Sequence, residues 1–83
     1  MKPVYSKAVA KAIGGMDNAT KQRIKAAIEK LPEGDIKPLQ GYGGKTHRLR
    51  VGGYRVVFRY ETDEEGVQYP FIMEMDSRGD IYK

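Results

Sequence analysis

The stretch that decides the fold is residues 47–60, HRLRVGGYRVVFRY, in which two alternating segments flank a pair of glycines. Polar or basic and apolar side chains alternate in residues 47–51 and again in residues 54–60, which is the period of a β-strand with two different faces. Gly52-Gly53 between them is a signal for a two-residue hairpin turn. The stretch therefore predicts a β-hairpin with one apolar and one basic face.

A two-residue turn also predicts which side chains lie opposite each other. It pairs Arg50 with Arg55, and directly opposed residues share a face of the sheet. The apolar face then carries Leu49, Val51, Tyr54, Val56 and Phe58. The basic face carries Arg48, Arg50, Arg55 and Arg59, with Val57 among them. Like charges placed directly across a ladder cost up to ~1 kcal/mol, so the basic face calls for anions nearby.

Two explanations for the basic face remain open from the pattern alone. In the first, Glu74 and Asp76 on the following strand neutralise the arginines as an ordinary surface network. In the second, the face binds phosphates, which the planar fork of arginine holds well.

Two helices are expected before the hairpin. Ser6 is a candidate N-cap for a helix over Lys7–Ile13 that Gly14-Gly15 would end. Asp17 is the N-cap expected for a second helix that extends to Leu31 and is stopped by Pro32. The apolar stripe of this second helix has the spacing i, i+3, i+4 and i+7, and consists of Ile24, Ala27, Ile28 and Leu31.

The remaining segments complete the predicted fold. Residues 2–5 are expected to form a short edge strand, residues 32–46 a loop, and residues 67–76 a third strand of the meander, with Met73 and Met75 in the core. The prediction is an α+β domain in which an antiparallel two-helix hairpin packs on a three- to four-stranded antiparallel sheet.

Composition limits the function classes. The chain has 83 residues, which predicts a single domain over 1–83, and its formal net charge is +4 at pH 7. It has no cysteine and one histidine, His47, so disulfides, thiolate metal sites and multi-histidine zinc sites are excluded, and no cofactor or metal is expected. No apolar run approaches the ~20 residues that span a bilayer. We expect a cytoplasmic protein with no membrane partner.

Three motifs carry a resemblance to a known family. They are LPEGDIKPLQG (31–41), RLRVGGYRVVF (48–58) and DSRGDIYK (76–83). In combination they resemble the RelE/ParE superfamily of toxins from bacterial type II toxin–antitoxin systems, and within it the RelE-like branch. The resemblance extends over essentially the whole chain and implies the RelE-like fold.

The resemblance implies a function, partners and a site. The function is that of an mRNA interferase, a ribosome-dependent and metal-independent endoribonuclease that inhibits translation; the partners are a cognate antitoxin, the ribosome and mRNA. The catalytic residues implied are Arg48, Arg50, Arg55, Arg78 and Tyr82. The RNA-binding residues expected around them are Lys45, Arg59 and Lys83.

The resemblance also leaves alternatives to the nuclease open. Some family members have lysines where this chain has Arg48 and Arg50, and arginine does not release its proton. A catalytically weakened protein that binds RNA or an antitoxin is therefore a second hypothesis, and a ParE-like, non-enzymatic inhibitor of DNA gyrase is a third. His47 is not assigned to the site, because alternation places it on the apolar face.

Overall fold

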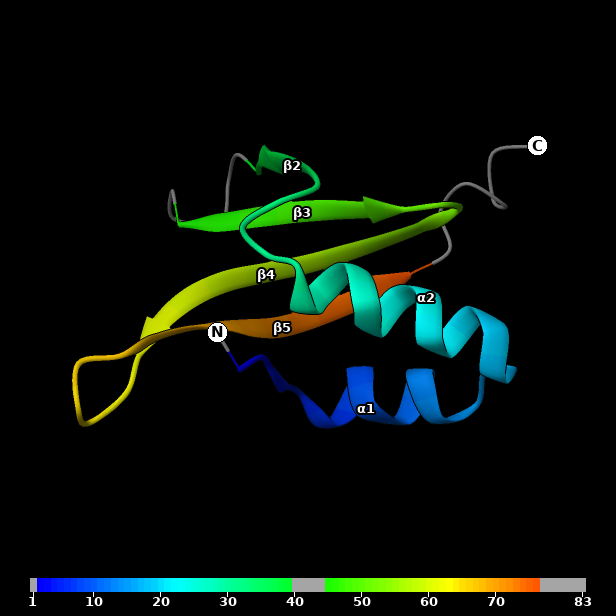
Figure 1. Ribbon diagram of the computed structural model, residues 1–83, viewed down its shortest axis with the longest axis horizontal. Coiled ribbons are helices and arrows are strands. Elements are labelled where there is room, and N and C mark those ends of the chain that lie inside the picture. Colours follow the sequence, from blue (N-terminus) through cyan, green and yellow to red (C-terminus); the bar gives the residue numbers. More distant parts are fainter. Residues whose placement is uncertain (1, 40–44, 77–83) are drawn as a thin grey trace.

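The computed structural model describes residues 2–39 and 45–76. Its elements, in chain order, are β1 (Val4–Tyr5), α1 (Lys7–Gly14), α2 (Asn18–Glu29), β2 (Asp35–Pro38), β3 (Thr46–Val51), β4 (Tyr54–Thr62) and β5 (Gln68–Asp76). The strands form one sheet in the order β1-β5-β4-β3-β2. Both helices lie on the same side of this sheet (Figure 1). The α+β class is confirmed.

The sheet is larger than predicted, and it is mixed. It has five strands, because Asp35–Pro38, which we expected to be loop, pairs antiparallel with β3. Pro38 is tolerated at the end of this strand because β2 is an edge strand with a single neighbour. The short N-terminal strand was expected, but it pairs parallel to β5, with Val4 opposite Phe71. The prediction of a three- to four-stranded antiparallel sheet was therefore wrong in strand count and in the direction of one edge.

The helix starts are those that the sequence predicts. The Ser6 hydroxyl oxygen accepts a hydrogen bond from the Val9 N–H at 3.2 Å and caps α1. A carboxylate oxygen of Asp17 accepts one from the Thr20 N–H at 3.2 Å and caps α2. The hydrogen bonds from Thr20 lower the pKa of the Asp17 carboxyl below its ordinary value. The two helices run in opposite directions (Figure 1), as the short connection between them requires.

The core lies between the helices and one face of the sheet. The predicted stripe of α2 is confirmed, since Ile24, Ile28 and Leu31 are buried and Ala27 packs against them. From the sheet, the buried residues in the same cluster are Leu49, Val51, Val56, Phe58 and Ile72. Each such side chain contributes about 1.5–3 kcal/mol by leaving water. Both helices pack on this face, so no helix formed by residues 2–39 or 45–76 covers the opposite face of the sheet.

A β-bulge changes the alternation of β5. Val57 pairs with Glu74 whereas the next residue, Phe58, pairs with Ile72, so Met73 is an extra residue without a partner in the ladder. Ile72 and Met75 consequently share the core side, and Met75 packs against the core. The prediction that Met73 also belongs to the core was wrong, because strict alternation does not hold across the bulge.

Candidate functional site

The predicted basic face exists and is the helix-free face of the sheet. The register is the one expected from the two-residue turn, with Arg50 opposite Arg55 and Arg48 opposite Val57. Alternate residues of a strand point to the same side, so Arg59 of β4 belongs to this face as well. We call it the open face (Figure 1).

The tight turn between β3 and β4 sets this register. Gly52 has φ +57° and is the turn residue that needs a left-handed backbone. Gly53 does not have a positive φ, which is the sign pattern of a type II′ turn. Such a turn follows the right-handed twist of the strands, and it keeps Arg50 and Arg55 directly across from each other.

Three of the four arginines on the open face have a carboxylate partner. Arg55 contacts Asp76 at 3.2 Å, and Arg48 contacts Asp35 at 3.5 Å. The third pair joins Arg59 and Glu61. Arg50 is exposed, and within residues 2–39 and 45–76 it has no ion pair. The network explanation is therefore right for Asp76, whereas Glu74 forms no ion pair with the described residues.

Because of these ion pairs, the arginines differ in how readily each can bind an anionic ligand. The Arg48 side chain is only 12% exposed, and its guanidinium also donates to the main-chain carbonyl of Asp35 at 3.2 Å, which ties β2 to β3. Arg50 and Arg55 lie beside the turn and are open to solvent. Partly exposed ion pairs contribute about 0–1 kcal/mol, so a phosphate can take the place of the carboxylate at Arg55. The two cations that can bind an anion most readily are thus Arg50 and Arg55.

The contact between Arg55 and Asp76 is incomplete. One terminal guanidinium nitrogen donates to Oδ2 at 3.2 Å. The Arg55 Nε and the Asp76 Oδ1 are buried and have no hydrogen-bond partner among the described residues. Arginine and carboxylate usually meet through two parallel hydrogen bonds. Arg55 therefore retains a donor beyond the one that Asp76 uses.

The structure places the other predicted residues as follows. Lys45 is exposed and directly precedes β3. His47 stacks on Phe58, with ring centroids 5.7 Å apart, and meets the edge of Tyr60 on the core side. The interpretation of His47 as a packing residue is thus confirmed. The remaining members of the predicted site, Arg78, Tyr82 and Lys83, lie outside the described residues.

The two tyrosines whose pKa is raised pack against the core and do not lie on the open face. Burial raises the pKa of the Tyr60 phenol, which packs against the core next to His47. Burial, followed by the nearby charge of Glu29, raises the pKa of Tyr5. Both phenols therefore stay protonated at neutral pH, as side chains packed on the core side.

Several residues of the open face were missed by sequence reasoning, among them Asp35, Glu61 and Phe71. Asp35 was missed because its segment was taken as loop. Glu61 follows Arg59 by two residues on the same strand, so extending the alternation by one step would have found it. Phe71 lies opposite Arg59, and it was missed because strict alternation with Met73 and Met75 places it on the core side, whereas the bulge at Met73 moves it to the open face.

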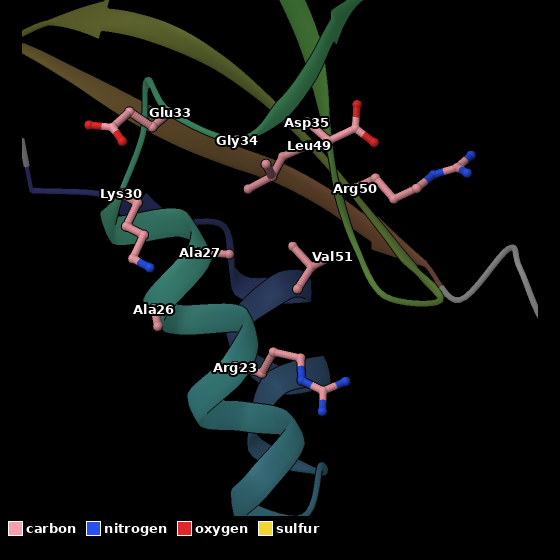
Figure 2. A pocket seen from close by; sticks show the side chains of 10 residues that line it. All are labelled: Arg23, Ala26, Ala27, Lys30, Glu33, Gly34, Asp35, Leu49, Arg50 and Val51. Atoms are coloured by element: carbon pink, nitrogen blue, oxygen red, sulfur yellow. The ribbon is translucent and has the colours of Figure 1, made fainter.

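A groove lies between α2 and the hairpin edge, with a volume of about 510 Å³. Its apolar lining includes Ala27, Leu49 and Val51. Arg23 extends from α2 toward the turn, whereas the side chain of Arg50 on β3 points away from the helix (Figure 2). The groove therefore combines an apolar floor with basic side chains on α2, Arg23 and Lys30, and acidic ones next to β2, Glu33 and Asp35.

Residues 2–39 and 45–76 contain no group of three or more His, Cys, Asp or Glu side chains that could hold a metal ion. Over the same ranges, no helix has the length and apolarity needed to cross a membrane.

The fold is similar to that of a chain in the crystal structure of the RelB-RelE antitoxin-toxin complex from Methanococcus jannaschii, with a TM-score of 0.67. The similarity covers 95% of this chain and 94% of that chain, at 23% sequence identity. No family profile matches the sequence, and no curated protein matches it. At this identity the similarity shows a shared fold.

Proposed function

We propose that this protein is the toxin of a type II toxin–antitoxin pair and that it acts as a ribosome-dependent mRNA endonuclease of the RelE-like branch. The observation that carries the proposal is the open face, on which Arg48, Arg50 and Arg55 gather without a helix over them. The shared fold with a chain of an antitoxin–toxin complex supports the same proposal.

The arginines suit the charge that develops when an RNA strand is cut. The 2′-hydroxyl attacks the neighbouring phosphate, the bond to the 5′-oxygen breaks, and extra negative charge collects on the phosphate oxygens in between. Arg50 and Arg55 lie side by side across the ladder and can hold these oxygens in a fixed geometry, which lowers the barrier by electrostatic stabilisation. In the proposed site Arg78 adds a further cation and Tyr82 orients the base or the 2′-hydroxyl, as the resemblance implies.

Proton transfer is the weak part of this mechanism. The attacking hydroxyl must lose a proton and the leaving 5′-oxygen must gain one. Arginine does not release its proton, and His47 packs on the core side of the sheet. In the proposed step the proton of the 2′-hydroxyl therefore passes to water or a ribosomal group and the 5′-oxygen takes its proton from the same kinds of group, while orientation in the ribosomal site supplies the positioning. We expect slower cleavage than a site with a general base would give.

The antitoxin is the second part of the proposal. The groove beside α2 has an apolar floor, and the basic side chains Arg23 and Lys30 lie along its α2 side, with Glu33 and Asp35 at the β2 end. An amphipathic segment with acidic side chains matches it in both respects, since helix-in-groove recognition uses apolar anchors and the charges select the partner. We assign this groove to a segment of the antitoxin.

The nuclease is tested by adding the protein to translating ribosomes and mapping new mRNA ends by primer extension. Arg50→Ala and Arg55→Ala are expected to slow cleavage about 100-fold, the usual cost of one preorganised oxyanion donor. Lys25→Ala is the matched control, because Lys25 is an exposed cation on α2, on the other side of the sheet. Cleavage that is unchanged in both arginine variants contradicts the site.

The alternatives give different outcomes in the same preparation. Inhibition of gyrase supercoiling without mRNA cleavage identifies a ParE-like inhibitor. RNA binding without cleavage identifies the weakened protein, which the paired arginines and the core-side His47 favour as the second candidate.

A further inference from the structure

One arginine of the open face is held differently from the others. Arg59 lies over the ring of Phe71, with its guanidinium carbon 5.8 Å from the ring centroid. Its Nε is paired with Glu61, two residues further along the same strand. The paired acids of Arg48 and Arg55 come from neighbouring strands instead. Arg59 is therefore fixed above an aromatic ring by its own strand.

This arrangement makes Arg59 a poor phosphate ligand. Glu61 offsets its charge locally and occupies one edge of the guanidinium, so fewer donors are free for a bidentate contact with phosphate. The guanidinium group is planar and stacks on flat π-systems. The Arg59 side chain is 45% exposed, so it can be reached from solvent while Phe71 supports it from the other side.

A second aromatic ring and a hollow lie next to this pair. Tyr69 is opposite Glu61 and thus on the same face as Phe71. A hollow of about 460 Å³ opens beside Tyr69, and Val4 and Val67 also line it. These two valines are the exposed large hydrophobic residues of the described chain. The hollow has the apolar lining that a flat ring prefers, and Asp63 and Gln68 at its edge can hydrogen-bond.

We propose that Arg59 and Phe71, with Tyr69 beside them, form a stacking platform for an unpaired base of single-stranded RNA. The proposal rests on the proposed RNA-binding function and assigns to Arg59 a base contact in place of a phosphate contact. Arg48 is paired with Val57, two residues before Arg59 on β4, so Arg48 lies in the neighbouring row of side chains on the open face. The open face thus presents cations for the RNA backbone and, next to them, planes for a base, which is the usual combination for single strands.

The test measures binding of the full chain to a labelled single-stranded oligoribonucleotide of about eight nucleotides, by fluorescence anisotropy at several salt concentrations. The same oligonucleotide with abasic residues is the second ligand. Arg59→Lys keeps the charge and loses the plane, and Phe71→Leu keeps an apolar side chain and loses the ring. Each is expected to weaken binding of the base-containing strand about tenfold. Binding of the abasic strand and the salt dependence of Arg59→Lys are expected to stay as in the wild type.

Arg50→Lys is the matched control, because it makes the same chemical change at a cation assigned to phosphate. It is expected to weaken binding of the base-containing and the abasic strand equally.

If Arg59→Lys weakens binding of both strands equally, or weakens neither, the platform is overturned. A loss confined to binding of a protein partner also overturns it and identifies a protein contact. Failure of the wild type to bind the oligoribonucleotide overturns the platform whatever the ribosome assay gives. Binding with the expected selectivity but without mRNA cleavage supports the platform and contradicts the nuclease alone.

Discussion

Asp76 sets how freely Arg55 can meet an anion. The two groups share one hydrogen bond of 3.2 Å, and each keeps a buried polar atom that no described residue satisfies. A carboxylate in this position holds the guanidinium in place, and it also repels an approaching phosphate. Because the pair is about one-third exposed, the attraction within it is small.

We therefore predict that Asp76→Asn binds single-stranded RNA more tightly than the wild type, by about two- to fivefold, which corresponds to a partly exposed ion pair. Glu74→Gln is the control, because Glu74 is an exposed acid on the same strand with no ion pair among the described residues. Glu74→Gln removes the same charge, so any larger gain in RNA affinity for Asp76→Asn reports on the contact between Asp76 and Arg55. Weaker binding by Asp76→Asn than by Glu74→Gln would show that Asp76 positions Arg55 for RNA.

At the scale of elements, the start of α1 joins the helix layer to the sheet. The Ser6 hydroxyl accepts from the Val9 N–H and also donates to the main-chain carbonyl of Met73 at 3.0 Å. The Ser6 N–H donates to the carbonyl of Ile72 at 2.9 Å. One residue thus caps a helix and ties it to β5 at the position of the bulge.

Ser6→Ala is predicted to lower the free energy of unfolding by about 1–2 kcal/mol, the upper part of the range for loss of an N-cap, because it removes the contact with β5 as well. Urea unfolding followed by circular dichroism measures this change. Asn18→Ala, at the first residue of α2 and outside the cap, is the control and is expected to change stability little. A loss below 0.5 kcal/mol for Ser6→Ala, a threshold at the low end of cap effects, would contradict the double role.

The elements that the sequence predicts correctly are those with a strong local signal. Ser6 and Asp17 mark helix starts through side-chain capping, and the Gly52-Gly53 turn sets a register that alternation then extends. β2 was missed because four residues between prolines and glycines carry no period of their own; pairing with β3 alone makes them a strand. The bulge at Met73 is likewise a property of two strands together and leaves no mark on either sequence.

The candidate site likewise contains residues that a local sequence signal predicts and residues that depend on the pairing of distant strands. Alternation brought together Arg48, Arg50 and Arg55, because they flank a turn that fixes their pairing. The acidic partners of Arg48 and Arg55 come from other strands, so these ion pairs could be identified only once the complete sheet was known. For the helix side of the sheet, the sequence predicted only the apolar stripe of α2. The groove beside this stripe could not be predicted, because it is formed by the packing of α2 on β3.

At the scale of the whole molecule, the two sides of the sheet have different partners in the proposed function. The open face binds RNA and the groove beside α2 receives the antitoxin. Arg50 lines the groove and belongs to the open face as well. An antitoxin segment in the groove therefore lies next to this residue and leaves the open face uncovered.

The groove is tested with a charge reversal. Arg23→Glu is predicted to weaken binding of the proposed antitoxin about tenfold, because an acidic segment meets repulsion at the rim of the groove. Lys25→Glu is the control, since it lies two residues along the same helix and does not line the groove. The measurement is the dissociation constant by isothermal titration calorimetry. Equal weakening by both variants would mean that net charge, and not the groove, selects the partner.

The position of β1 has a consequence for how the chain is made. β1 joins the sheet beside β5, and the hydrogen bond from Ser6 to Met73 spans 67 residues of sequence. A ribosome releases the N-terminal part first, so β1 and both helices emerge before the strand against which α1 packs. Their apolar sides stay uncovered until β5 follows, and contacts so distant in sequence form late and slowly. A chaperone or partner that binds the nascent chain therefore meets the helices, and Arg55 gains its partner Asp76 only as β5 enters the sheet.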